Sequence, residues 1–519
     1  MAPFDVPTQT YILPPDLSAG DVLERLTKSL STVNRGRPNP ALEAVAGPQQ
    51  VATWCVLDTA DQRLRAAGLD LGLESAHGQL VLRGTRGSRV VGQRSGRAPR
   101  RWLAADLPVA LRQRLAPVVG IRALLPVVVV RRREQPVEVH DRDAKTVVRL
   151  TLTDLWASPE TDPVRLPSRV EVAGVLGYPK AFARVDRLLQ RMDLDPTDVP
   201  VVDHALVADG RDPQPPRSRR SPELRPKDPG RAATQRVLAQ LAEVVEANLA
   251  GTLDDLDTEF LHDLRVAVRR SRSVLREMKK VFEPQARRAQ ADALRWVQAV
   301  TGPTRDLDVQ LLEWDELVAH LPAESRADVG VAHEVLTERR TDAFRAMRAT
   351  LRSAGYQQRW GSWRAFVAEP PAPADDRAGQ RAIRRLAGRR IRSVYRAMVR
   401  DGSAIDQSSP PEALHDLRKR GKELRYLLEL FGGVLPASKV KPLVASLKGL
   451  QDVLGRHQDR EVQAESLRAL GPEVAARPGG ADALMALGAL VDRLRTEQGE
   501  ARDQFVDRFT AFAGLPVPK

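Results

Sequence analysis

The sequence of 519 residues has few of the residues that build thiol-based sites or read nucleic-acid bases. Its one cysteine, Cys55, excludes an intrachain disulfide framework and a zinc site made of several thiolates, and it favours a reducing compartment. Aromatic residues make up only 4% of the chain. Because base recognition relies on aromatic stacking and dedicated modules, this scarcity argues against sequence-specific nucleic-acid binding.

Long apolar runs are also lacking. The strongest run, Ala123–Val130, is far shorter than the roughly 20 residues that cross a bilayer. The N-terminal segment MAPFDVPTQTYILPPDL has no basic stretch followed by an apolar core, as a secretory signal would. We therefore expect a cytoplasmic protein with no membrane partner.

The motifs of common catalytic and cofactor sites are missing as well. The chain has no GxxxxGK[ST] phosphate loop, no HExxH, and no cysteine and histidine spacing that suits zinc. We assign no catalytic residue, no metal ligand and no cofactor. No pattern in the sequence specifies an oligomeric state.

Positive charge is what the chain has in excess. The formal net charge is +14, which favours a polyanionic partner. The bias toward Ala, Arg, Val, Leu and Pro is typical of GC-rich coding sequence, which raises the arginine count at neutral positions. The arrangement of the charges is therefore more informative than their number.

Patterning divides the chain in two. Short β-rich runs with alternating polarity, accompanied by two helical segments, predict an α+β domain at residues 1–205. The Pro- and Arg-rich stretch 206–231 has the composition of a linker. Residues 232–515 show long amphipathic helices, and a Pro-rich run at Pro370–Pro373 separates two helical subdomains, about 232–368 and 380–515.

The helical half contains an internal repeat. LHDLRVAVRRSRSVL from Leu261 matches LHDLRKRGKELRYLL from Leu414 at an offset of 153 residues. A second segment, ending at Val309, matches one ending at Val462 at the same offset and without a gap. Two separate segments that share one offset indicate a tandem duplication.

The repeated helix carries a basic stripe. Five cations of the first copy follow i, i+3, i+7, i+10 and i+14 spacing, which places them within an arc of about 80° on a helix. The apolar residues Leu261, Leu264, Val268, Leu275, Leu414, Leu417 and Leu428 lie beside the stripes and are expected in the core. The stripes consist of His262, Arg265, Arg269, Arg272 and Arg276 in the first copy, and His415, Arg418, Lys422 and Arg425 in the second.

Like charges stacked along one helix face repel one another, and a bound polyanion would remove that repulsion. The alternative is a solvated helix face that is neutralised by Asp263, Asp416, Glu277 and neighbouring helices. The repetition of the His/Arg pattern in both copies favours a binding site. If the copies pack about a pseudo-twofold axis, both stripes could line one groove.

On these motifs, together with RDLDV and LQDVLGRHQD, residues 232–515 resemble the CHAD family, the conserved histidine α-helical domain. The resemblance implies two helical-bundle repeats whose basic residues bind inorganic polyphosphate without catalysis. It assigns this role to His262, Arg265, Arg269, Arg272, Arg276, His415, Arg418, Lys422 and Arg425. Lys279, Lys439 and Lys441 are further candidates.

The first half resembles a divergent CYTH domain, a triphosphate-tunnel β-barrel that often precedes a CHAD domain. The resemblance is carried by LDTADQRLRAAGLDL from Leu57, by Arg131–Arg133 and by VHDRDAKTVVRLTLTDLW from Val139. That family's metal chemistry requires paired carboxylates. In this chain the expected Glu-x-Glu-x-Lys positions are occupied by Thr8, Thr10 and Ile12, and the position of a further acid is occupied by Arg149. The family's other acids and phosphate-binding cations remain as Glu171, Asp154, Arg83, Arg131 and Arg133.

We therefore expect little or no triphosphatase activity from this domain, which could instead bind phosphate or serve as a scaffold or dimerisation module. The preferred function of the whole chain is inorganic polyphosphate binding, which would target polyphosphate bodies. One alternative is a metal-dependent triphosphatase or polyphosphatase in the first domain. Another is non-specific nucleic-acid binding, which we do not favour.

Overall fold

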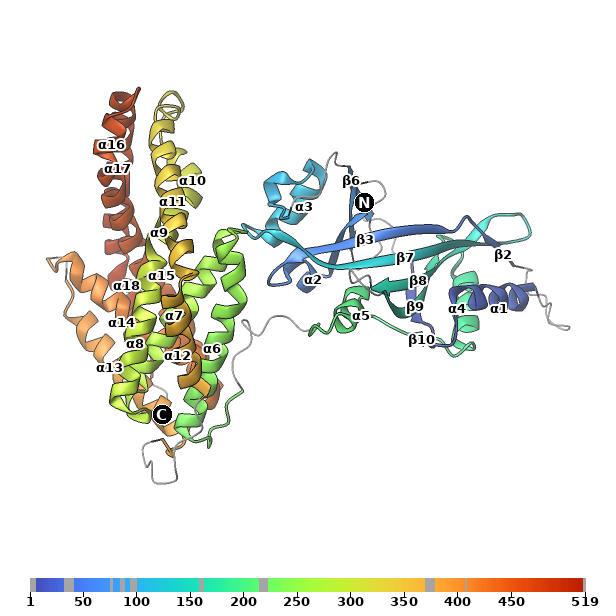
Figure 1. Ribbon diagram of the computed structural model, residues 1–519, viewed down its shortest axis with the longest axis horizontal. Helices are drawn as coiled ribbons and strands as arrows, with labels where there is room; N and C mark the ends of the chain where they lie inside the picture. Colours follow the sequence, from blue (N-terminus) through green and yellow to red (C-terminus); the bar gives the residue numbers. More distant parts are fainter. Residues whose placement is uncertain are drawn as a thin grey trace. The chain divides into compact units, whose positions relative to one another are not determined.

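The computed structural model forms two compact units, Met1–Pro216 and Arg217–Lys519 (Figure 1). The boundary falls within the segment predicted as a linker. Part of that segment and Pro370–Pro373 lie outside the described residues. The structure describes residues 6–31, 42–74, 78–84, 89–93, 100–157, 163–213, 223–368, 379–406 and 408–516.

The first unit is built on one ten-stranded antiparallel sheet, ordered β10-β1-β9-β8-β7-β3-β4-β5-β6, with β2 also on β7. The strands are β1 (Thr8–Ile12), β2 (Glu43–Ala46), β3 (Gln50–Thr59), β4 (Leu69–Glu74), β5 (Gln79–Gly84), β6 (Arg89–Gln93), β7 (Leu124–His140), β8 (Thr146–Ala157), β9 (Val164–Gly174) and β10 (Asp195–Pro196). The helices are α1 (Ala19–Ser31), α2 (Arg63–Ala66), α3 (Val109–Val119), α4 (Pro179–Gln190) and α5 (Val201–Ala208), with a short 3-10 helix, η1 (Ala104–Asp106).

The antiparallel sheet confirms the α+β prediction, but the predicted closed barrel is wrong. Among the described residues, no ladder joins the end strands β6 and β10. Alternating polarity predicts which face of a strand is buried, whereas closure depends on strand tilt and stagger, which the pattern does not encode.

Strand β7 is 17 residues long and continues through Pro136. Its edge is shared by β3, up to Glu134, and β2, from Val137 onward. The Pro136 carbonyl oxygen accepts a hydrogen bond from the Gly47 nitrogen at 2.8 Å, in the gap between β2 and β3. The missing N–H of proline therefore falls where neither ladder needs a donor.

The second unit is helical. It contains α6 (Gly230–Leu253), α7 (Thr258–Glu277), α8 (Pro284–Val300), α9 (Gly302–Leu312), α10 (Trp314–Val318), α11 (Gly330–Leu351), α12 (Ala354–Ala368), α13 (Ile383–Ser403), α14 (Pro411–Phe431), α15 (Ala437–Ala469), α16 (Gly471–Ala475), α17 (Gly480–Asp503) and α18 (Phe505–Ala513). Short 3-10 helices are η3 (Lys279–Val281), η4 (Ala323–Ser325) and η5 (Gly432–Val434). No helix in the described part of the chain is long and apolar enough to span a membrane.

The helices repeat at the offset found in the sequence. Four elements of the first copy, α6, α7, η3 and α8, begin 153 residues before α13, α14, η5 and α15 respectively. The copies also meet through equivalent backbone atoms. The Gly230 nitrogen donates to the Arg381 carbonyl at 2.8 Å, and the Ile383 nitrogen donates to the Asp228 carbonyl at 2.9 Å. Because each bond is the repeat equivalent of the other, they indicate a local pseudo-twofold relationship.

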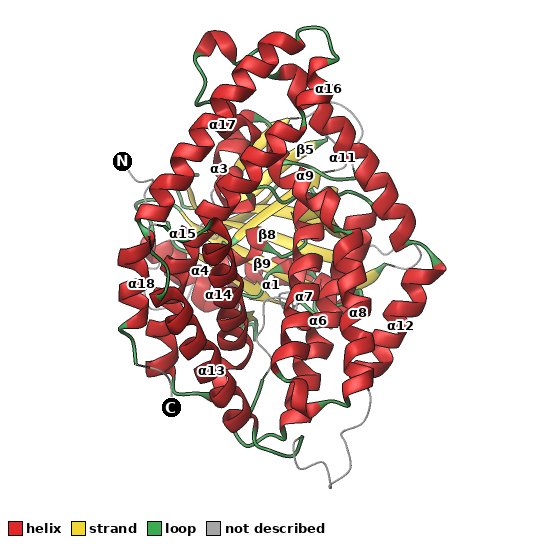
Figure 2. Ribbon diagram, turned by 90° about the vertical axis from the view of Figure 1, so that its left-hand side faces the viewer, coloured by secondary structure: helices red, strands yellow, loops and turns green. Residues whose placement is uncertain are grey.

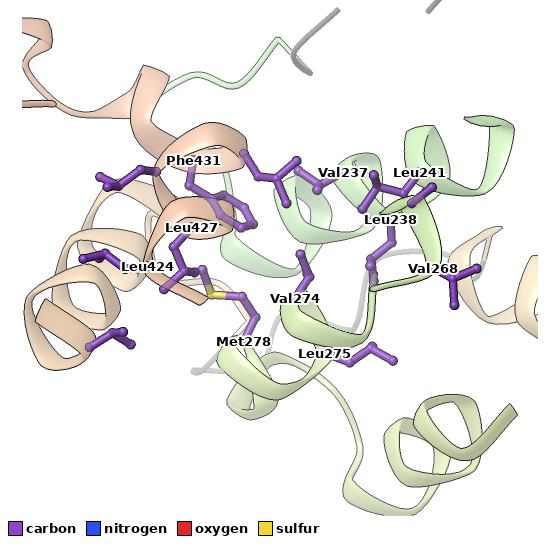
Figure 3. Close-up of a cluster of buried hydrophobic side chains, with 14 of the residues drawn as sticks. Val237, Leu238, Leu241, Val268, Val274, Leu275, Met278, Leu424, Leu427 and Phe431 are labelled. Carbon is purple, nitrogen blue, oxygen red and sulfur yellow. The ribbon is translucent and has the colours of Figure 1, made fainter. Parts of the chain in front are cut away.

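One hydrophobic core holds the two copies together. Helices α7 and α14 contact each other near the middle of the unit, as Figure 2 shows from the helical side. Val274 and Met278 belong to the same buried cluster as Leu424, Leu427 and Phe431 of the second copy (Figure 3). Burial of each such side chain is worth about 1.5–3 kcal/mol, so this core fixes the two stripe-bearing helices against each other.

Candidate functional site

The stripe-bearing helices form as their apolar spacing predicts. Helix α7 begins at an N-cap, Asp257, whose carboxylate accepts hydrogen bonds from the Glu259 and Phe260 nitrogens at 2.9 and 3.2 Å. Helix α14 begins with Pro411 in its first turn. The seven residues predicted to face the core are all buried, namely Leu261, Leu264, Val268, Leu275, Leu414, Leu417 and Leu428.

The first arginine of the stripe, Arg265, is fixed by the neighbouring helices. Its Nη1 donates to the Gln298 carbonyl oxygen at 2.8 Å and to Thr301 Oγ1 at 2.9 Å. These acceptors lie where α8 ends and α9 begins, next to Pro303, which cannot continue the backbone hydrogen-bond ladder. Arg265 therefore satisfies acceptors at a helix break.

Its repeat equivalent, Arg418, has a different partner. Arg418 Nη2 lies 2.8 Å from Asp459 Oδ1, and the helix in this copy, α15, runs without a break. The equivalent acid in the first copy is Asp306. Burial raises the pKa of Asp306, and the charge of Arg265 partly offsets this rise. The two arginines therefore differ in what holds them, although the sequence motif is the same.

Three further arginines of the stripes are paired. Arg272 donates to the Gln298 side-chain oxygen. Arg276 bonds Glu277 and Glu423, each at 2.8 Å, and Arg425 bonds Glu429 at 2.6 Å. Glu277 thus pairs with Arg276, and Asp459 of the neighbouring helix α15 pairs with Arg418, as expected for a neutralised helix face. Asp416 pairs with Lys419, which lies outside the stripe.

The remaining cations, Arg269 and Lys422, occupy the same position in the two copies and have no hydrogen-bond or ion-pair partner among the described residues. Arg269 Nε is buried without a partner. Burial, followed by the charges of Arg418 and Arg269, lowers the pKa of Lys422 to about 8. The charge of Arg269 in the first copy therefore acts on Lys422 in the second.

The histidines at the start of the stripes also differ. Burial and then the charge of Arg305 lower the pKa of His262, so this imidazole is neutral near pH 7. His415 Nδ1 donates to the side-chain oxygen of Gln458, which replaces Arg305 in the second copy. The residue beside the histidine is Arg305 of α9 in the first copy and Gln458 of the unbroken helix α15 in the second.

The sequence interpretation missed two flanking cations, Arg295 and Lys448. Burial, followed by the charges of Arg295 and Arg276, lowers the pKa of Arg272, and Arg295 itself pairs with Asp292 at 2.9 Å. Lys448 is its exposed repeat equivalent. The shared offset of the two copies was the signal that could have identified them. Lys279, Lys439 and Lys441 are exposed and have no ion pair within the described residues.

In the first unit, the residues at the CYTH family's carboxylate positions have other partners. Thr10 of β1 pairs with Glu171 of β9, and Arg149 lies 3.7 Å from Glu138. Asp154 is buried and accepts a hydrogen bond from Ser168 at 2.7 Å. Within the residues that the structure describes, no three His, Cys, Asp or Glu side chains gather in a way that could hold a metal ion.

The basic residues predicted for this unit lie elsewhere on its sheet. The guanidinium groups of Arg131 and Arg133 lie 5.0 and 4.9 Å from the centre of the Trp156 ring. Such cation–π contacts account for the packing of both arginines without a ligand. The Arg83 side chain lies outside the described part.

Comparison with known proteins places the helical unit in a family. The CHAD domain model matches residues 236–468. Two uncharacterized proteins of Mycobacterium tuberculosis are 28% identical over 262 residues, which cover 50% of this chain and 48% of theirs. The chain thus matches about half the length of these curated relatives.

Two solved structures are similar at 20% identity. The CHAD domain from the plant Ricinus communis aligns with a TM-score of 0.48, covering 57% of this chain and 96% of that structure. PptA from Streptomyces chartreusis aligns with a TM-score of 0.43, and the alignment covers 55% of this chain and 100% of PptA.

Proposed function

Because residues 236–468 are a CHAD domain, we propose that this protein binds inorganic polyphosphate across the surface where α7 and α14 meet. The observation that carries the proposal is the pair Arg269 and Lys422, two repeat-equivalent cations without a partner in the described residues. A folded protein gains nothing from such a pair in the absence of an anion, since like charges repel and burial disfavours each charge.

A polyphosphate chain matches what this surface offers. Its anionic oxygens are repeated along a flexible line, so one chain can contact both stripes in succession. Arg269 supplies a forked set of donors and Lys422 a point charge, and both are suited to phosphate oxygens. Counterions released from the chain would add to the affinity and make it fall with salt.

The paired residues have a different role in this proposal. Arg265, Arg272 and Arg276 are held by protein acceptors, so they present their remaining donors from fixed positions. A site whose donors are already ordered loses less side-chain entropy when it binds. Arg418 and Arg425, held by Asp459 and Glu429, form the corresponding border in the second copy.

Nucleic acid is a less suitable ligand for this surface. No aromatic side chain belongs to either basic stripe, whereas single-stranded nucleic acid is held largely by stacking on aromatic rings. The proposed role of polyphosphate binding is to tether the protein to cytoplasmic polyphosphate bodies. Catalysis is not part of it.

The test is a binding titration of the full chain with long-chain polyphosphate, with tripolyphosphate and RNA as competitors. The variant R269E/K422E reverses the two unpartnered charges and is expected to weaken binding at least tenfold. The matched control is R468E/R495E, which makes the same change in net charge at exposed positions of α15 and α17. Equal losses in both variants, or displacement by RNA at equal phosphate concentration, would contradict the proposal.

A further inference from the structure

A second row of arginines lies on helix α13, outside the stripes described above. Arg385, Arg389, Arg392, Arg396 and Arg400 follow i, i+4, i+7, i+11 and i+15 spacing, which places them within an arc of about 80°. The opposite side of the helix is buried through Ile383, Ala387, Ile391, Val394 and Met398. We call these five arginines the α13 row.

Three members of the α13 row lack a countercharge. Arg385, Arg389 and Arg396 are exposed and form no hydrogen bond or ion pair with any described residue. The other two members of the row do have interactions. Arg400 pairs with Asp401 at 2.8 Å, and Arg392 also interacts with another group of the protein. An exposed row of uncompensated arginines is a strong local field that attracts a polyanion.

The first copy has no such row. The equivalents of Arg385, Arg389 and Arg396 in α6 are Ala232, Arg236 and Glu243, and Arg236 is ion-paired with Asp228. The two helices share their position in the repeat but differ on the solvent side. The α13 row is therefore a specific feature of the second copy rather than a property of the duplicated fold.

The helix that carries the row contacts the end of the α7 stripe. Glu277, which is fully buried, bonds Arg276 of the stripe through Oε1 and Arg390 of α13 through Oε2. Arg390 lies on the same helix as the row and is partly exposed. Glu277 therefore joins the end of the α7 stripe to helix α13, at a position about 120° around the helix axis from the middle of the row.

We propose that the α13 row binds the continuation of a polyphosphate chain that leaves the α7–α14 surface, so that the protein selects long chains over short ones. This inference rests on the proposed function. From Arg385 to Arg396 the row extends about 16 Å along the helix axis. The proposal requires that tripolyphosphate bound between Arg269 and Lys422 leaves the row empty.

The experiment compares the affinities of the full chain for long-chain polyphosphate and for tripolyphosphate. The variant R389E/R396E is expected to weaken long-chain binding about fivefold and to lower the slope of log affinity against log salt by about 1 to 2. Its affinity for tripolyphosphate is expected to stay within twofold of the wild-type value. R269E/K422E is expected to weaken binding of both ligands, and R468E/R495E of neither. Circular dichroism of each variant verifies folding.

The outcomes separate the two proposals. Unchanged long-chain affinity in R389E/R396E, with R269E/K422E impaired, overturns the role of the α13 row and leaves the proposed function standing. An equal loss for both ligands, or a loss as large in R468E/R495E, also overturns it. If R389E/R396E loses RNA binding and keeps polyphosphate binding, the row serves nucleic acid instead. Failure of the wild-type protein to bind either phosphate ligand removes both proposals.

Discussion

Arg269 of α7 and Lys422 of α14 are the same position in two copies of one duplicated helix, and the charge of Arg269 acts on Lys422, although neither has an ion-pair partner among the described residues. Burial lowers the pKa of Lys422 to about 8, and the charges of Arg418 and Arg269 add to this effect. A charge that the folded protein disfavours reduces stability, so the site is expected to trade stability for binding. This relationship leads to the first prediction.

Replacing Lys422 by Met is expected to stabilise the protein. Folding lowers the pKa of Lys422 from 10.5 to about 8. Above pH 10.5 the lysine is neutral in both states and costs no stability, and this stability is lost as the pH falls to about 8, because the folded protein disfavours the charged form. After allowance for the partial exposure of Lys422, the free energy of unfolding of K422M is expected to be about 1 kcal/mol higher than that of the wild type near pH 7. Urea unfolding followed by circular dichroism measures this difference.

The same variant is expected to bind polyphosphate more weakly. The stability difference between K422M and the wild type should also shrink as pH rises from about 8 toward 10.5, because the lysine of the unfolded chain then loses its proton as well. A less stable K422M protein at pH 7 would contradict this interpretation of the residue.

Arg265 and Arg418 are equivalent in sequence but are expected to differ in their effect on stability. R265A removes donors from the Gln298 carbonyl and Thr301 at the break between α8 and α9, so the expected loss is about 1–2 kcal/mol. R418A removes an ion pair whose acid, Asp459, is 60% exposed, so the expected loss is below about 1 kcal/mol. Thermal unfolding of the two variants side by side tests the order, and equal losses would argue against it.

The helical unit could be predicted closely because its duplication has no gap. One offset, read from LHDLR and the segment ending at Val309, also gives the starts of α13, α14 and α15 from those of α6, α7 and α8. Amphipathic spacing correctly predicted the buried leucines. The arginine spacing on α13 is equally readable from the sequence, but it does not recur in the first copy, where the positions equivalent to Arg385 and Arg396 are Ala232 and Glu243.

What the sequence could not provide was which cations have partners. Gln298, Glu423 and Glu429 lie at separations unrelated to the stripe spacing, so tertiary packing alone decides that Arg272, Arg276 and Arg425 are paired. In the first unit, the alternation of apolar and polar residues predicted the strands, but it did not predict that the sheet is open. The partner change at Pro136 likewise depends on Gly47, which is far away in sequence.

The first unit is expected to release no phosphate from tripolyphosphate with Mg²⁺ or Mn²⁺. Thr10 stands opposite Glu171 on the neighbouring strand, so this carboxylate has no acidic partner on β1 with which to hold a divalent ion. Colorimetric phosphate release from the full chain is the measurement. Metal-dependent release that E171Q abolishes, while E138Q at the exposed Glu138 does not, would restore the enzymatic alternative.

The affinity for polyphosphate is expected to fall as pH rises above about 8. In the free protein, Lys422 loses its proton near this pH, because burial, Arg418 and Arg269 outweigh the opposing charge of Asp459. A bound phosphate raises the pKa of the lysine, so binding takes up a proton in this range. Between pH about 8 and about 9.5, the dissociation constant is expected to rise by up to about tenfold per pH unit.

The variant K422R separates this lysine from every other titrating group. Arginine keeps its charge throughout this range, and it is the residue that the first copy already has at Arg269. The K422R protein is therefore expected to bind with an affinity that is nearly constant from pH 8 to 9.5, whereas the wild type weakens. Isothermal titration in two buffers of different ionisation enthalpy measures the proton uptake directly. A wild-type affinity as flat as that of K422R, or equal slopes in both proteins, would mean that Lys422 does not contact the bound chain, and Arg269 would then have to carry the centre of the site alone.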